Sequence, residues 1–311
     1  MDLITIIMTV GRSAVELALF VLLPIMVVML CLMRLIEAAG VMDWVVAKLA
    51  PVLRPAGLTG LSLFAMIQVN LVSFAAPLAT LAMMDRRGAS DRHLAATLAM
   101  IFAMAQANVL YPMSAIGLDL GTTLLVSVLG GIVASAVTFH VIGRSLSSTE
   151  PPMSEAIEHP EFKGPSGVLQ VINQAGGEAF KIAVATIPLV ALALVAVAIL
   201  REAGAFSMIE HLLTPVLAWA GVPPTLIVPT LTKYLGGGTA VLGVMVSLHT
   251  QHLIDVHLMN ASAGWLIHTF DLPGVAILIS AGPRVAKIWK PAAIGGVIGI
   301  TVRTMIHIAI N

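Results

Sequence analysis

Polar side chains lie deep inside two long apolar stretches of this sequence. Gln106 and Asn108 follow the start of one stretch, near residue 94, and His268, Thr269 and Asp271 follow the start of another, near residue 258. At about 1.5 Å per helical residue, both groups would lie roughly 15–21 Å deep, near the centre of an apolar layer about 30 Å thick. Polar groups at that depth usually face a protein interior or a wet cavity, so we expect them to bind a solute.

Each group has a structural alternative. Gln106 and Asn108 could simply link helices by hydrogen bonds. Asp271 favours a functional role more strongly, because a buried carboxylate needs a partner. His268 lies within one turn of Asp271 if the helix is intact, and the pair could then carry a coupling proton.

Two proline motifs predict breaks in the same stretches. Asp271-Leu272-Pro273-Gly274 removes a backbone donor and adds a flexible glycine, and Tyr111-Pro112 plays a similar part in the first stretch. Free carbonyls at such breaks can hold a cation, and the amino ends of half-helices can hold an anionic group.

Two further apolar segments, 58–84 and 222–248, are interrupted in the middle. The second contains three consecutive glycines, each costing about 1 kcal/mol in a helix interior, so one continuous span is not expected. Broken backbone inside a membrane must be satisfied by protein or water, which predicts two re-entrant hairpins. The alternatives are that the glycines only allow close helix packing and that Lys233 extends to the headgroups. The tips add these candidate substrate-binding residues: Gln68, Asn70, Ser73, Lys233, Gly237 and Thr239.

A cluster of metal-ligand residue types lies beside the second hairpin. Imidazole and carboxylate groups at such spacing suit zinc or a similar divalent ion, whereas the alternative is a set of hydrated polar residues at the membrane surface. The residues are His249, His252, Asp255 and His257.

The composition is that of an integral membrane protein. Hydrophobic residues make up 59% of the 311 positions and charged residues 10%, and the mean hydropathy is +1.01. The net charge is zero without a basic block, which argues against a nucleic-acid partner. The single Cys31 excludes an intramolecular disulfide framework. No phosphate-binding loop, nucleophile elbow or zinc-protease helix is present, so we do not expect an enzyme.

The apolar pattern predicts an all-α polytopic fold. Two shorter segments, 41–55 and 205–219, are expected either to lie at the membrane interface or to pack on the spans. A polar, Pro-rich region centred on 145–165 divides the chain into a first repeat (1–144), a cytoplasmic linker (145–179) and a second repeat (180–311). Spans are expected near 14–34, 94–115, 118–143, 181–201, 258–281 and 291–310.

An internal repeat relates the two halves. The block Ala39-Gly40…Leu49-x-Pro51-Val52-Leu53…Ala56-Gly57 returns as Ala203-Gly204…Leu213-x-Pro215-Val216-Leu217…Ala220-Gly221. Further along, Gly130-Gly131 matches Gly295-Gly296. Three spans, an interfacial helix and a hairpin per half make about six spans and two hairpins. The odd number of crossings inverts the second half relative to the first, an arrangement that suits alternating access.

The basic residues support this topology. If both hairpins are re-entrant, four basic residues are left for the outer side, namely Arg12, Arg201, Arg303 and the mid-hairpin Lys233, and both termini lie outside. Twelve face it: Arg34, Lys48, Arg54, Arg86, Arg87, Arg92, Arg144, Lys163, Lys181, Arg284, Lys287 and Lys290.

The order of span, interfacial helix, hairpin, span and span resembles the core of concentrative nucleoside transporters. The repeated Ala-Gly blocks resemble the nucleoside recognition (Gate) domain, which also occurs in spore maturation proteins and in the membrane part of ferrous iron transporters. The resemblance covers about 15–144 and 180–309. It implies a ligand between the hairpin tips and the following spans, with Gln68 similar to the glutamine of the family's Gly-Gln-Thr-Glu signature. Here its neighbours are Ile67, Val69 and Asn70, and neither tip carries a carboxylate.

The sequence therefore predicts a secondary transporter of a small polar solute, for which the resemblance suggests a nucleoside-like molecule. The alternatives are a divalent-metal permease or accessory and a non-transporting membrane assembly protein of the spore-maturation type. No cofactor is expected, and Na⁺ or H⁺ is the candidate coupling ion. The expected location is the bacterial inner membrane, with the lipid bilayer and the solute as partners and homo-oligomer formation left open.

Overall fold

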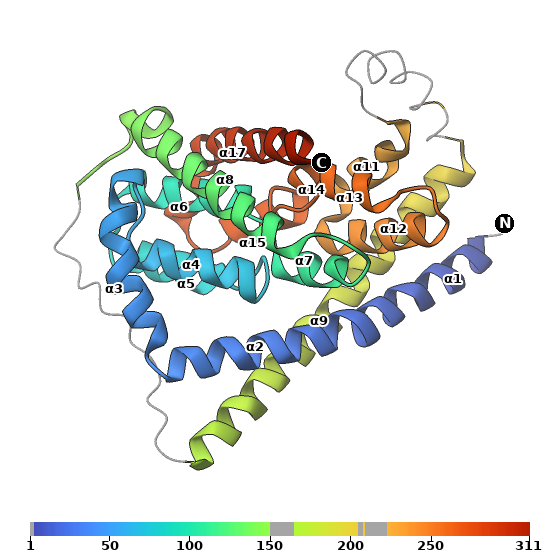
Figure 1. Ribbon diagram of the computed structural model, residues 1–311, viewed down its shortest axis with the longest axis horizontal. Helices are drawn as coiled ribbons and strands as arrows, with labels where there is room; N and C mark the ends of the chain where they lie inside the picture. Colours follow the sequence, from blue (N-terminus) through green and yellow to red (C-terminus); the bar gives the residue numbers. More distant parts are fainter. Residues whose placement is uncertain (1–2, 150–164, 205–207, 209–222) are drawn as a thin grey trace.

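The computed structural model describes residues 3–149, 165–204, 208 and 223–311, and within these ranges it contains helices and no strands. The chain begins with one long apolar helix, formed by α1 (Leu3–Glu16), a π-helical segment (Leu17–Leu22) and α2 (Leu23–Ala38). This helix crosses α9 (Pro165–Glu202) along one side of a compact bundle (Figure 1).

Four helical stretches of the described chain are long and apolar enough to cross a membrane. They are Ile7–Ile36, Asp91–Ser114, Leu120–Ser145 and Trp289–Ile310, and they overlap four of the predicted spans. A fifth predicted span, 181–201, lies within α9. The multi-pass membrane character expected from composition is therefore confirmed.

The predicted span at 258–281 is broken. It consists of α13 (Val256–Ala261), α14 (Ala263–Leu266) and α15 (Leu272–Ile279), with non-helical backbone at 267–271. Asp271 is the N-cap of α15 and Pro273 lies in its first turn, so this break falls where the proline motif predicts it.

The break in the first half lies elsewhere than predicted. The helix α6 (Asp91–Ala103) ends at an extended Met104, and α7 (Ala107–Ser114) begins after an extended Gln106. The prediction of a break at Tyr111-Pro112 is wrong, because both residues lie inside α7. A proline there removes a single backbone donor, which this short helix tolerates.

Each interrupted segment forms two helices that contact each other, and these two helix pairs are called the first and the second hairpin below. In the first, α4 (Gly60–Leu71) and α5 (Pro77–Arg86) lie side by side (Figure 1), and Thr59 and Ser62 form a capping box at the start of α4. In the second, α11 (Ile227–Gly236) and α12 (Gly238–Thr250) meet at Gly237. The backbone there has φ +85°, a conformation that favours glycine.

The segment before the first hairpin forms α3 (Val41–Leu53), which leaves Trp44 and Val52 exposed and bends by 103° into α4. Its predicted counterpart, 205–219, lies almost entirely outside the described residues, as do linker residues 150–164. Residues 165–179, predicted as linker, belong instead to α9. Val171, Ala175 and Ala179 recur every four residues and are buried, which explains why the helix extends this far.

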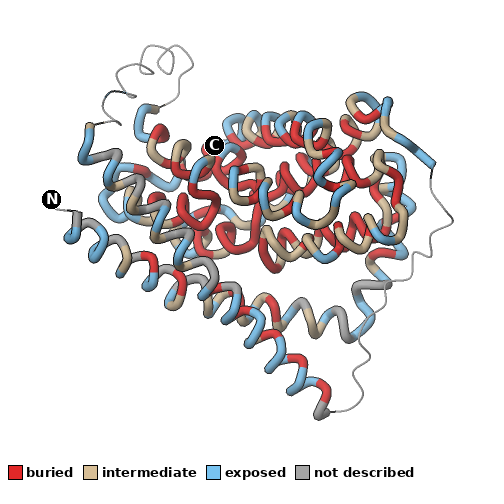
Figure 2. Tube along the Cα trace, turned by 180° about the vertical axis from the view of Figure 1, so that it is seen from behind, coloured by how far each residue is buried: buried red, intermediate tan, exposed pale blue. Residues whose placement is uncertain are grey.

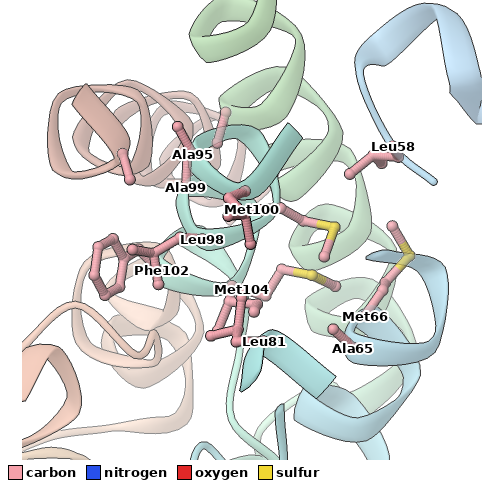
Figure 3. Packing of buried hydrophobic residues seen from close by; sticks show 14 of the residues in the cluster. Leu58, Ala65, Met66, Leu81, Ala95, Leu98, Ala99, Met100, Phe102 and Met104 are labelled. Atoms are coloured by element: carbon pink, nitrogen blue, oxygen red, sulfur yellow. The ribbon is translucent and has the colours of Figure 1, made fainter. Parts of the chain in front are cut away.

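Three helices form the centre of the bundle: α6, α8 (Leu120–His140) and α17 (Trp289–Ile310). Every residue of α6 from Leu94 to Ala103 is buried, and buried positions concentrate in this part of the tube in Figure 2. Met100 and Met104 extend toward Met66 of the first hairpin (Figure 3). On another side of α6, the Phe102 and Phe270 rings are 5.2 Å apart, edge to face.

Arg284, in the short helix α16 (Pro283–Lys287), ties the second half to the first hairpin. Its guanidinium donates to Asp91 Oδ1 at 2.6 Å and to the Ala89 carbonyl at 2.5 Å, and lies 3.5 Å from Asp85 Oδ1.

Arg284→Met should lower the free energy of unfolding by about 1–2 kcal/mol, since it removes charge-assisted hydrogen bonds at a partly exposed site. Thermal denaturation in detergent measures this. The control is Lys287→Met at an exposed position of the same helix. Equal stability of both variants and the parent would show that the arginine contributes nothing.

Candidate functional site

The two helix breaks meet in the buried centre. Gln106, at the start of α7, donates from Nε2 to the carbonyl oxygen of His268 at 2.8 Å. Both residues are buried, and they are 162 positions apart in the chain. Thr269 of the second break donates from Oγ1 to the carbonyl of Ile101, in the last turn of α6. Side chains of each broken span thus satisfy backbone acceptors of the other.

The start of α12 also reaches this point. Asn108 Nδ2 donates to Thr239 Oγ1 at 3.1 Å. A Cβ on Gly238 would overlap the Gln106 side-chain amide, so the glycine allows α12 to approach α7. The three glycines therefore serve both as a backbone break, at Gly237, and as a close contact, at Gly238. Asn108 Oδ1 is buried and has no hydrogen-bond partner among the described residues.

Lys233 and Asp271 form a buried ion pair between α11 and the start of α15. The side chain of Lys233 is completely buried, so the alternative in which it extends to the headgroups is wrong. Asp271 also accepts from the Gly274 N–H at 2.7 Å and caps α15. The carboxylate therefore has the partner that its burial requires.

His268 is not paired with Asp271, contrary to the predicted proton-carrying pair. The backbone is non-helical here, so the one-turn spacing that would bring them together does not exist. The Phe270 N–H donates to His268 Nδ1 at 3.1 Å, and Nε2 lies 3.4 Å from the hydroxyl of Tyr234. Because Nδ1 accepts, the proton of the neutral ring belongs on Nε2, facing Tyr234.

The first hairpin connects to the first break. Ser127 Oγ, on α8, accepts from the Ala105 N–H at 2.8 Å and donates to Asn70 Oδ1 at 3.1 Å. Gln68 Oε1 accepts from Thr80 Oγ1 at 2.7 Å, which links α4 to α5. Ser73 Oγ is buried and has no partner among the described residues. The predicted residues thus fall into two groups, one at each hairpin, joined through the broken spans.

Arg303 is a central residue that the sequence pattern did not predict. The assignment of basic residues to the two membrane sides places Arg303 on the outer side, but its side chain is fully buried in α17. It donates from Nη1 to the carbonyl of Ala103 and from Nη2 to the carbonyl of Ile267 at 2.9 Å. Its signal in the sequence is a lone arginine inside the last apolar run.

Two of the four candidate metal ligands make other contacts. Asp255 accepts from the Leu258 N–H at 2.7 Å as the cap of α13, and His249 Nδ1 lies 3.2 Å from the Ile254 carbonyl. His252 occupies a turn with φ +57°. Across the part of the chain that the structure describes, no three His, Cys, Asp or Glu side chains form a group that could hold a metal. The arrangement gives no support to a metal site at His249, His252, Asp255 and His257.

Comparison with known proteins agrees with the resemblance seen in the sequence. Residues 19–143 match the Gate family, described as nucleoside recognition. A search of curated proteins gave no match. The fold is similar to that of the concentrative nucleoside transporter CNTnw in an inward-facing substrate-bound state (TM-score 0.70, 17% identity, 94% of this chain and 74% of that chain).

Two other states of CNTnw are similarly close. A variant in an outward-facing state gives a TM-score of 0.69 at 17% identity, over 95% of this chain and 77% of that one. A variant in an intermediate state gives 0.66 at 16% identity, over 99% and 84%. At such identity the likeness establishes a shared fold. The Gate match over residues 19–143 agrees with that fold.

Proposed function

We propose that this chain is a secondary transporter of a small polar solute, nucleoside-like in chemistry, which works by alternating access around its hairpin tips. One observation carries the proposal: the second hairpin and both helix breaks converge on one buried polar cluster. Broken helices that meet inside an apolar bundle are the usual setting of solute and ion sites in transporters. The Gate match and the CNTnw-like fold also support this proposed function.

An inverted repeat is part of this proposal, and the packing of α8 against α17 supports it. A Cβ on Gly130 would meet the side chain of Arg303, and a Cβ on Gly295 would meet that of Thr138. The glycine-pair alignment relates these two contacts by the same shift, 130 to 295 and 138 to 303. Such reciprocal contacts are expected across a two-fold axis between inverted halves.

In the proposed topology each half contributes three spans, an interfacial helix and a re-entrant hairpin. Both termini lie on the outer side of the bacterial inner membrane. The contacts between α4 and α5 and between α11 and α12 are those that hairpins would make.

The proposed site comprises the two groups already described. Asn108 Oδ1 is an acceptor available to a donor on the solute, since no other described residue hydrogen-bonds to it. The Lys233–Asp271 pair must separate if α11 moves away from the second break, so the pair holds α11 against this break. Na⁺ and H⁺ remain the candidate coupling ions. The set is Gln68, Asn70, Ser73, Gln106, Asn108, Lys233, Gly237, Thr239, His268, Thr269 and Asp271.

A thermal-shift screen of nucleosides, nucleobases and organic acids tests the proposal. One solute class should raise the melting temperature of the purified protein. Asn108→Ala should weaken that solute's affinity about tenfold, because losing one hydrogen bond to a buried group costs about 1–2 kcal/mol.

The matched control is Asn173→Ala, at an exposed position of α9, which should leave the affinity unchanged. An unchanged affinity in Asn108→Ala would remove this residue from the site. No response to any solute, together with a stable protein partner in pull-down, would favour an assembly role over transport.

A further inference from the structure

Arg303 holds the ends of two broken helices. Ala103 is the last residue of α6, and Ile267 directly follows α14; the guanidinium donates to the carbonyls of both. The last carbonyls of a helix have no partner within that helix and carry partial negative charge. Arg303 therefore lies at the point where the negative ends of both broken spans meet.

The charge of Arg303 is balanced in an unusual way. No carboxylate pairs with it among the described residues, and Asp271, the one acidic residue that is buried in this part of the chain, pairs with Lys233. The other titratable groups that interact with its charge are Lys233, His268 and His307, which lies one turn along α17. A buried charge without a counterion is very costly unless dipoles stabilise it. Here the carbonyl groups of Ala103 and Ile267, at the ends of the two helices, supply that stabilisation.

Such a pair of unwound helix ends is where transporters coordinate an inorganic cation. We propose that Arg303 is a resident cation that occupies this junction permanently, so that the two broken spans are held together here without an ion from solution. The planar guanidinium suits this role, because its fork of donors reaches two carbonyls at once. Arg303 is a positioning residue, and the inference holds whatever the solute is.

Only one of the two repeat-related positions carries an arginine, and a glycine on the neighbouring helix leaves space for it. A Cβ on Gly130 would lie 2.5 Å from Arg303 Cδ, so the glycine is needed for the arginine stem to pass. Under the proposed repeat the equivalent residue is Thr138, whose hydroxyl donates to the Ala134 carbonyl of its own helix at 2.7 Å. This side chain reaches neither break, so the resident cation belongs to the second half alone.

Chemical rescue of Arg303→Ala tests the proposal. The variant should melt at a lower temperature than the parent, and methylguanidinium should restore a large part of the loss. N-methylurea, a neutral molecule of the same shape, should restore nothing at equal concentration and ionic strength. Rescue by N-methylurea to the same extent, or by neither compound, would overturn the proposal. The control is Arg12→Ala, at an exposed position, which should show no response to either compound.

A second comparison covers the case in which Arg303→Ala does not fold. Arg303→Lys keeps the positive charge and Arg303→Met keeps the length of the stem without the charge. The parent should melt highest, then the lysine variant, then the methionine variant. A methionine variant as stable as the lysine variant would show that charge at this position is unimportant and would overturn the proposal.

The vacated site should also take up an inorganic cation. Replacing choline with Na⁺ or K⁺ at constant ionic strength should stabilise Arg303→Ala more than it stabilises the parent. The readout is the stabilisation of Arg303→Ala minus that of the parent. A separate cation site would stabilise both proteins equally and would not contribute to this difference. An equal response in both proteins would count against the proposal.

Discussion

Lys233→Met should destabilise the protein by about 3–5 kcal/mol, the largest effect that we expect from one side chain. The substitution leaves the Asp271 carboxylate buried without its ammonium partner, and an unpaired buried charge is far more costly than a neutral group. The melting temperature in detergent should fall by many degrees. Lys181→Met, at an exposed position of α9, is the matched control and should change stability by less than about 0.5 kcal/mol.

The double variant Lys233→Met/Asp271→Asn separates charge from packing. Asparagine can still cap α15, so the pair is removed while the cap remains. The double variant should therefore recover most of the stability that the single variant loses. If it is as unstable as Lys233→Met alone, the loss comes from packing, and the buried charge is not its cause. The recovered variant should still fail in solute binding if the pair belongs to the site.

Gly299→Ala should cost about 1–3 kcal/mol, because a methyl group there overfills the contact between the three central helices. Its Cβ would lie 2.5 Å from the Gly130 carbonyl oxygen and 2.8 Å from the Cβ atoms of Ala103 and Ala134. Backbone and short side chains cannot move aside as a long side chain can, so whole helices must shift. Thermal or denaturant unfolding measures the loss.

Gly176→Ala in α9 is the matched control. A Cβ there would meet nothing within 4 Å, and alanine is the better helix former by about 1 kcal/mol. The two glycine-to-alanine changes should therefore act in opposite directions. Equal small effects would mean that the central helices pack less closely than described.

Local chemistry explains how much of this fold could be predicted from the sequence. Gly237 and Pro273 impose backbone conformations on their own, so the break in the second hairpin and the break before α15 could be predicted. The break at Met104–Gln106 could not, because methionine and alanine are good helix formers. It is held by contacts from distant segments, such as the Ser127 hydroxyl on the Ala105 N–H. Tertiary structure overrides local preference at this point.

The candidate site was predicted in part for a similar reason. Gln106, Asn108, Lys233 and Asp271 stand out as polar residues in apolar runs, and the structure places them around one centre. Their pairing was harder to predict, since His268 and Asp271 are separated by non-helical backbone. Arg303 was missed because counting charges by membrane side assumes that each basic residue reaches water. A buried arginine bound to carbonyls does not.

The central position of α6 also has a consequence for how the protein is made. This helix is covered by α8 and by α17, and a ribosome completes α17 after every other described helix. One side of α6, with the carbonyl of Ala103, is therefore uncovered in the membrane until the last 22-residue helix has been inserted. The centre of the bundle can close only after synthesis of α17. Until then other parts of the nascent chain, or the insertion machinery, must cover the exposed backbone at the end of α6.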